Sequence, residues 1–308
     1  MPGSADDDYL PLDDVGRLYA RFTRVFGKPA AWKERGHLFV VTGERGYGKA
    51  RLIKRCRAWL EASARGHGCR IVWVDLSSAR WDGAEGAEML NLTVGRMLDA
   101  LESLNLVDPE VRARVEAEGH PAERFHELTE SLRVRPDSDG RRVVPVVLLQ
   151  DHLTQKKVFE YYNAVDKGAI FFTKIFDPDE IAKIRNNWHD LDRGDVVVPH
   201  RMVLDALNPG DFRTMAKQAN LRNGGVPLIT EKIIGYVEER YVERESGVGP
   251  GELFKLMRGM LRAARDDHSS EVDYKHIADY YAQAIDEDEY EDEDEDEGDP
   301  DEGDPDTE

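Results

Sequence analysis

Residues 37–51 read HLFVVTGERGYGKAR, an apolar run followed by a glycine-rich segment and a Gly-Lys pair. The apolar run before Gly43 is typical of a buried strand. Three closely spaced glycines, Gly43, Gly46 and Gly48, indicate a loop with unusual backbone angles. The residues after Lys49, rich in Arg and Leu, suit a helix that runs to about Ala64. This stretch therefore predicts a strand, a tight loop and a helix in succession.

The loop matches the phosphate-binding P-loop pattern at all positions except the last. Backbone N–H groups at a helix N-terminus form an anion site, and the lysine would reach the β- and γ-phosphates of a nucleotide. We expect contacts to a nucleotide from Gly43, Glu44, Arg45, Gly46, Tyr47, Gly48, Lys49, Ala50 and Arg51. Ala50 stands where the pattern has Ser or Thr, whose hydroxyl binds Mg²⁺. The motif thus predicts triphosphate binding and places hydrolysis in doubt.

Apolar runs and helical patterns alternate from the N-terminal region to about residue 207. Strands are predicted at 70–76, 143–150, 169–175 and 195–204, and helices at 13–26, 154–165 and 178–188, with two or three more within 84–133. This alternation predicts an α/β fold with three layers and a mainly parallel sheet. From Pro209 onward only helices are expected, at 210–220, 226–243, 250–265 and 272–284. We therefore expect an α/β P-loop domain over 1–208 and a helical domain over 209–285.

The remaining residues, 286–308, form an acidic tail that dominates the charge of the chain. They include 17 acidic residues and no Lys or Arg, whereas the whole chain of 308 residues has a net charge of −20. Without the tail, 45 acidic residues face 42 basic ones, which leaves a nearly neutral body. Low complexity and self-repulsion predict disorder. The tail is interpreted either as a solubilising segment or as a nucleic-acid mimic that masks a basic surface.

Several functional classes are disfavoured by what the sequence contains. The two cysteines, Cys56 and Cys69, suggest neither a disulfide framework nor a metal site, and the histidines show no paired spacing. The longest apolar run, 143–149, is far shorter than a membrane span, and the N-terminal residues do not resemble a signal peptide. We expect a cytoplasmic protein without a membrane partner.

The order of strand, P-loop, helix, second strand and helical domain resembles the AAA+ and STAND group of P-loop NTPases over about residues 13–285. The resemblance implies bound ATP, with GTP as an alternative, together with Mg²⁺. It also implies that the helical domain is a lid. The Gly-Gly-Val-Pro sequence that ends at Pro227 is similar to the element that opens the lid in this group, where the proline packs near the base.

Residues 143–152, VVPVVLLQDH, resemble the Walker B strand of this group. In the family this strand ends with an Asp for the metal and an acid that polarises water. If Asp151 is the metal acid, His152 occupies the position of the second acid; if Asp151 is the second acid, Gln150 replaces the first. One carboxylate is missing in either register. The resemblance further implies that Thr173 and Lys174, at the tip of the next strand, sense the γ-phosphate.

These departures from the family pattern affect the positions that would bind Mg²⁺ and activate water. The residues that would bind phosphate match the pattern. The sequence therefore predicts a nucleotide-dependent conformational switch with slow or absent hydrolysis. Two alternatives remain: a non-hydrolysing assembly or adaptor protein, and a DNA-associated AAA+ ATPase. We also expect a protein partner or a homo-oligomer. A basic cluster at Arg51, Lys54, Arg55 and Arg57 leaves nucleic acid possible, although no nucleic-acid-binding motif accompanies it.

Overall fold

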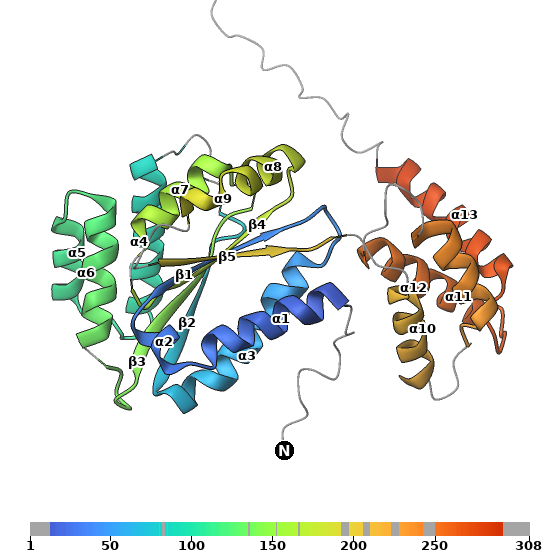
Figure 1. Ribbon diagram of the computed structural model, residues 1–308, viewed down its shortest axis with the longest axis horizontal. Helices are drawn as coiled ribbons and strands as arrows, with labels where there is room; N and C mark the ends of the chain where they lie inside the picture. The colour runs from blue at the N-terminus through green and yellow to red at the C-terminus, as the bar shows by residue number, and fades with distance from the viewer. Residues whose placement is uncertain are drawn as a thin grey trace, which may run out of the picture. The chain divides into compact units, whose positions relative to one another are not determined.

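The computed structural model describes residues 13–79, 81, 84, 86–134, 136–151, 153–165, 167–191, 197–205, 210–222, 228–242 and 250–291. The chain divides into two compact units, Met1–Leu207 and Asn208–Glu308. The first is an α/β unit and the second is a helical unit (Figure 1).

The α/β unit contains a five-stranded sheet with the order β2-β3-β4-β1-β5, and each of its four strand pairings is parallel. The strands are β1 (Gly36–Thr42), β2 (Cys69–Asp75), β3 (Arg142–Leu148), β4 (Ile170–Ile175) and β5 (Val197–Val203). Parallel neighbours that are distant in sequence require helical crossovers, which the intervening segments supply. The predicted α/β fold with a parallel sheet is confirmed, and the strand ends differ from the prediction by at most two residues.

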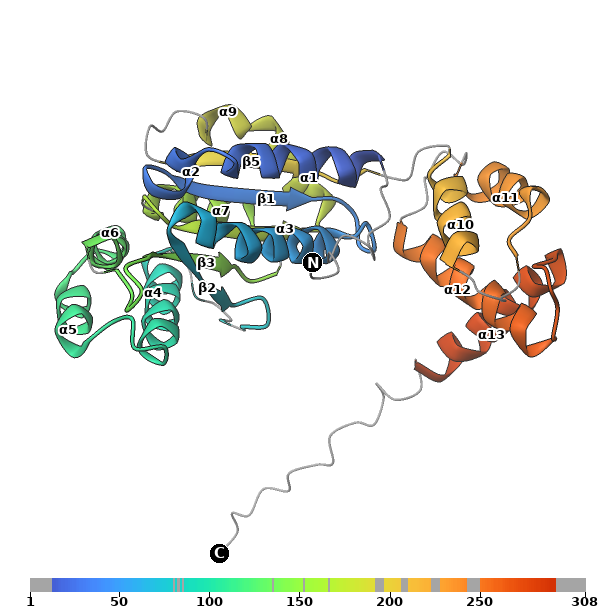
Figure 2. The ribbon, with the colours of Figure 1, turned by 90° about the horizontal axis from the view of Figure 1, so that it is seen from below.

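Helices cover both faces of this sheet, as Figure 2 shows. On one face α1 (Asp13–Phe26) and α3 (Lys49–Ala64) pack together over a cluster of aromatic rings that includes Phe22, Phe39 and Phe172. The other face packs against longer insertions through aliphatic side chains such as Val40, Val74 and Val147. These insertions form α4 (Gly86–Glu102), α5 (Pro109–Ala117), α6 (Pro121–Val134), α7 (Gln155–Ala164) and α8 (Pro178–Asn186).

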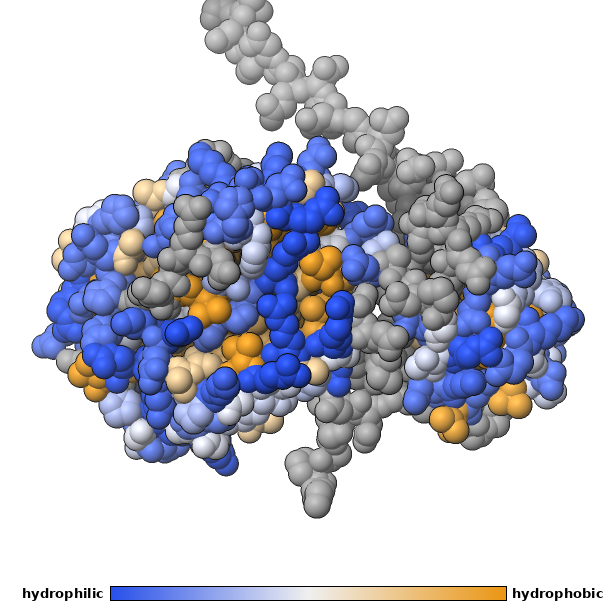
Figure 3. Space-filling view, in the orientation of Figure 1, coloured by the Kyte–Doolittle hydropathy of each residue, from blue (hydrophilic) through white to orange (hydrophobic). Residues whose placement is uncertain are grey.

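The described part of the segment between β2 and β3 contains three helices, α4, α5 and α6, where the sequence predicted two or three. The second of them begins at a proline that follows Asp108, whose carboxylate accepts a hydrogen bond from the Val111 amide. Three short elements complete the unit: α2 (Pro29–Lys33), η1 (Arg65–His67) and α9 (Trp188–Leu191). In the view of Figure 3 this unit exposes mostly hydrophilic residues, with small apolar areas between them.

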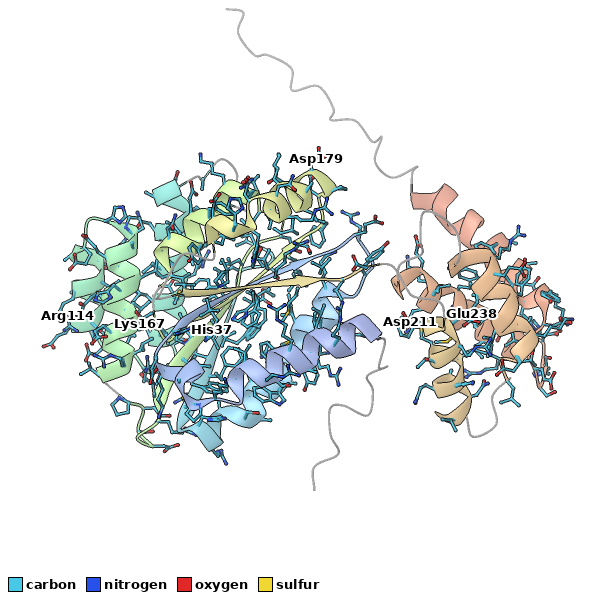
Figure 4. All side chains as sticks on the ribbon, in the orientation of Figure 1. His37, Arg114, Lys167, Asp179, Asp211 and Glu238 are labelled. Atoms are coloured by element: carbon cyan, nitrogen blue, oxygen red, sulfur yellow. The ribbon has the colours of Figure 1, made fainter. Side chains whose placement is uncertain are left out.

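A buried histidine pair lies where β1 and β5 begin to run side by side. His37, labelled in Figure 4, has Nδ1 3.0 Å from Nε2 of His200 and Nε2 2.9 Å from the carbonyl oxygen of Ala31. Because a carbonyl oxygen only accepts, His37 donates from Nε2, and His200 therefore donates to Nδ1 of His37. Burial lowers the pKa of His37 to about 4 and that of His200 to about 3, so both imidazoles are neutral near pH 7.

The helical unit contains α10 (Asp211–Arg222), α11 (Glu231–Val237) with η2 (Glu238–Val242), α12 (Pro250–Asp266) and α13 (Tyr274–Glu291). Asp211 and Glu238 of this unit are labelled in Figure 4, and the Glu238 carboxylate accepts a 2.9 Å hydrogen bond from the Arg213 guanidinium. The unit is helical, as the sequence predicts.

Two predicted boundaries in this unit are wrong. The helix expected over 226–243 begins only at Glu231, because Leu228 instead forms an isolated parallel bridge to Glu271 and Thr230 caps the helix. The last helix continues to Glu291, so it includes residues 286–291, which the sequence assigned to a disordered tail. Glu has high helix propensity, and residues 286–291 extend a helix that is already nucleated, which costs less than starting a new one.

In the described ranges, no helix combines the length and the apolar character needed to cross a membrane.

Candidate functional site

The loop between β1 and α3 has backbone angles that favour glycine at three positions. Gly46 and Gly48 each have φ of +84°, and Gly43 has φ of +148°. A Cβ atom at Gly43 would lie 2.5 Å from the carbonyl oxygen of Leu204, which follows the neighbouring strand β5. Gly46 and Gly48 are therefore required for the turn, whereas Gly43 is required for the turn and for close packing against Leu204.

The loop leads directly into the first turn of α3. Helix α3 begins at Lys49 after Gly48, and no side chain in the described part of the chain caps it. The first regular bond joins the Leu52 amide to the carbonyl oxygen of Gly48 at 2.9 Å. Amides at the very start of a helix have no partner inside the helix, and the helix dipole favours negative charge there. This helix start is therefore suited to an anion such as a phosphate group.

Lys49 is almost completely buried, with 4% of its surface exposed. Its ammonium donates hydrogen bonds to the carbonyl oxygens of Gly43 and Glu44, and it lies 4.5 Å from the ring centre of Phe176. Burial, together with the positive charge of Lys174, lowers the pKa of Lys49 to about 8. The carboxylates of Asp151 and Glu44 act in the opposite direction, and a phosphate group would supply further negative charge.

The second component of the site is an ion pair at the carboxyl ends of two adjacent strands. Asp151 follows β3 and Lys174 lies near the end of β4, and these strands are neighbours with Leu148 opposite Phe172. The ammonium nitrogen of Lys174 lies 2.8 Å from Oδ1 and 2.9 Å from Oδ2 of Asp151. The sequence predicted both residues for the site, and the fold brings them together at the carboxyl ends of β3 and β4.

The other candidate residues near these strands are placed differently. Gln150 is buried, whereas Asp151 forms the ion pair with Lys174. Thr173 is completely buried, and its hydroxyl has no hydrogen-bond partner in the described chain. Alternation along a strand puts the side chains of Thr173 and Lys174 on opposite faces of the sheet. His152 and Pro227 lie outside the described residues.

A hollow of about 350 Å³ lies beside the P-loop, between α3 and the strands β2 and β3. Ten residues line it: Ala50, Ile53, Lys54, Arg57, Ala58, Glu61, Trp73, Asp75, Leu148 and Lys174. The position that lacks the hydroxyl and the lysine that contacts Asp151 therefore border the same space. The sequence analysis did not identify Asp75, Trp73 or Phe176. Asp75 and Phe176 each stand at or just after the end of an apolar strand, and that position could have indicated them.

The residues present fit a magnesium ion poorly. Ala50 offers no oxygen ligand, and Asp151 already has both carboxylate oxygens in contact with an ammonium group. Mg²⁺ requires oxygen ligands in near-octahedral geometry. In the described part of the chain no cluster of three or more His, Cys, Asp or Glu side chains could bind a metal ion.

The strand order, the P-loop and the following helical unit define a P-loop fold of the AAA+ class. Comparison with solved structures supports this assignment of the fold. The chain is similar to Cdc6p from Pyrobaculum aerophilum, with a TM-score of 0.53, 12% identity, and coverage of 90% of this chain and 69% of that one. It is also similar to the Aeropyrum pernix ORC1 protein in complex with DNA, with a TM-score of 0.54, 15% identity, and coverage of 90% and 67%.

A third similar structure is Drosophila ORC bound to DNA, with a TM-score of 0.54, 12% identity, and coverage of 90% of this chain and 63% of that chain. No family model matches the sequence, and no curated protein matches it. At these identities the comparisons establish the AAA+ fold, and the more specific resemblance to the STAND group stays a prediction.

Proposed function

We propose that this protein is an ATP-binding AAA+ switch that hydrolyses its nucleotide slowly or not at all. The observation that carries the proposal is a buried lysine, Lys49, at the start of a helix whose N-terminus has no side-chain cap in the described chain. A site with these groups binds the β- and γ-phosphates of a nucleotide. One of the structures similar to this fold, Aeropyrum pernix ORC2, was determined as ADPNP-ADP complexes, which supports adenine over guanine.

Slow turnover follows from the composition of the other half of the site. Hydrolysis in P-loop proteins depends on a positioned metal ion and an oriented water molecule. Ala50 removes one metal ligand, and Lys174 engages the carboxylate that would supply another. We therefore expect nucleotide binding to be retained and hydrolysis to be slow or absent. We expect the helical unit to respond to nucleotide as a lid, with Pro227 near the base.

The test compares wild-type protein with Lys49→Ala for ATP binding by calorimetry and for phosphate release. Binding that Lys49→Ala abolishes, with phosphate release near the uncatalysed rate, is the expected result. Multiple turnovers by the wild type that Lys49→Ala abolishes would instead identify a working ATPase. Absence of binding by the wild type would show that the loop has no nucleotide function, and the adaptor alternative would then be favoured.

A second candidate function is association with DNA. Two of the similar structures are proteins bound to DNA. Within the α/β unit, Arg51 and Lys54 are exposed on α3, one helical turn apart, and Arg57 follows one turn later. A surface of this kind would bind the phosphate backbone without reading sequence.

The acidic tail offers a test of this second candidate. Because α13 runs to Glu291, truncation after Glu291 removes residues 292–308 of the acidic tail without cutting the helix. If the tail competes for the basic surface of α3, truncation should increase affinity for a duplex DNA, and the gain should diminish as salt rises. Equal and negligible affinity of both proteins at low salt would argue against DNA binding.

A further inference from the structure

The ion pair of Asp151 and Lys174 has a consequence for the form of nucleotide that this site accepts. In P-loop NTPases a Mg²⁺ ion bridges the β- and γ-phosphates and is held by the P-loop hydroxyl and by a strand acid. Here the hydroxyl is replaced by the methyl group of Ala50. The acid is occupied by an ammonium group at 2.8 and 2.9 Å from its two oxygens. Of the two positions that would hold the metal, one therefore has no oxygen ligand and the other is paired with an ammonium group.

Lys174 is well placed to supply positive charge where the metal would have supplied it. Its side chain is only 12% exposed, so its ammonium is held in place by the fold rather than free in solvent. It lies close enough to Lys49 to lower the pKa of that lysine. It also borders the same hollow as Ala50. Two ammonium groups thus face the phosphate end of the site from the P-loop and from β4.

The same charges oppose a divalent cation. A Mg²⁺ ion that approached Asp151 would have to displace the Lys174 ammonium and would then lie beside two positive groups. The carboxylates of Asp151 and Glu44 attract the Lys49 ammonium and offset part of this positive charge. Asp75, which also borders the hollow, accepts hydrogen bonds from the amide and hydroxyl of Ser77. The site is therefore more suitable for a metal-free polyanion than for a nucleotide with bound metal.

We propose that the Lys174 ammonium, oriented by Asp151, replaces the metal ion and that the protein binds ATP without Mg²⁺. This inference rests on the proposed nucleotide binding and specifies its chemical form. Asp151 is a positioning residue in this arrangement, because it acts on the nucleotide through Lys174. A positioning role and a metal-ligand role for Asp151 predict opposite results for Asp151→Asn. ATP binding should persist if Asp151 positions Lys174, and it should be lost if Asp151 binds the metal.

The experiment titrates full-length protein with ATP by calorimetry, once in excess EDTA and once in excess Mg²⁺. We expect the affinity in EDTA to equal or exceed that in Mg²⁺. Lys174→Met should weaken binding in EDTA at least tenfold. Lys183→Met is the matched control, since it removes the same charge from an exposed lysine of α8 that pairs with Glu180, and it should leave the affinity unchanged.

Asp151→Asn provides a second variant that retains the ammonium and disturbs packing least. Binding in EDTA should persist in Asp151→Asn, because the amide oxygen can still accept from Lys174 while a negative charge is removed. Wild-type binding that requires Mg²⁺ and is lost in Asp151→Asn would overturn the inference and leave nucleotide binding intact. Absence of binding in both buffers would instead refute the proposed function itself.

Discussion

The affinity for ATP should fall steeply as the pH rises from 7 to 9, because Lys49 must carry its proton to bind phosphate. Burial and the neighbouring Lys174 lower the pKa of Lys49 to about 8. A lysine with that pKa is about 90% protonated at pH 7 and about 10% protonated at pH 9. If only the protonated form binds, the affinity decreases about tenfold over this interval, which corresponds to about 1.4 kcal/mol. An ordinary lysine would remain almost fully protonated and would give a nearly flat profile.

The assay is calorimetry with ATP at half-unit steps of pH and constant ionic strength. Proton uptake provides an independent measure, because bound phosphate stabilises the charged form and the complex should take up nearly one proton at pH 9. Lys174→Met offers a comparison, since loss of the neighbouring positive charge should raise the pKa of Lys49 and move the decline to higher pH. An affinity that is constant between pH 7 and pH 9, without proton uptake, would refute the reasoning.

Two further predictions concern the stability of the α/β unit. Gly43→Ala should destabilise it by about 1–3 kcal/mol in urea unfolding, because an added Cβ atom would be strained at this backbone angle and would clash with the Leu204 carbonyl. Gly95→Ala is the control: Gly95 lies inside α4 with open space around it, so this substitution should be neutral or slightly stabilising. The depressed pKa values of His37 and His200 mean that the unfolded chain binds more protons below pH 6.5, so stability is lost as the pH falls from 6.5 toward 4. Between pH 6.5 and pH 5 the loss is about 1.5 kcal/mol for each imidazole, and equal free energies of unfolding at these two pH values would contradict it.

Local sequence patterns were sufficient to predict the sheet and most of the helices. Apolar runs of strand length separated by helical crossovers leave few arrangements other than a parallel sheet. The P-loop glycines could be recognised because each has a conformational requirement that a short motif encodes. Predicted helix boundaries were wrong where the chain pairs with a segment that is distant in sequence. The bridge between Leu228 and Glu271 is an example, because a sequence pattern contains no information about a partner that lies more than forty residues away.

Some residues of the candidate site could be identified from the sequence, but their arrangement could not. Asp151 and Lys174 were each identified from their resemblance to family positions at the ends of two strands. Their ion pair, by contrast, depends on β3 and β4 being neighbours in the sheet. The depressed pKa of Lys49 also required the fold, since it results from burial and from a lysine that is distant in sequence.

The final prediction concerns substitutions at Ala50 and Lys174 that should create a Mg²⁺ site. Ala50→Thr alone supplies the missing hydroxyl, but Asp151 remains paired with Lys174, so added Mg²⁺ should improve ATP affinity little. Lys174→Asn alone frees the carboxylate, yet one metal ligand is still absent. Only the double variant provides both oxygen ligands and removes an opposing charge, so its affinity in Mg²⁺ should exceed its affinity in EDTA by at least tenfold.

This double-mutant cycle measures the coupling between two positions that lie on different elements of the site. A coupling near zero, with each single variant gaining Mg²⁺ dependence independently, would show that Ala50 and Lys174 do not act at a common metal position. A large favourable coupling would show that a threonine at position 50 and the carboxylate of Asp151 bind one ion together. In that case the Lys174 ammonium of the natural sequence supplies the positive charge that the metal ion supplies in the double variant.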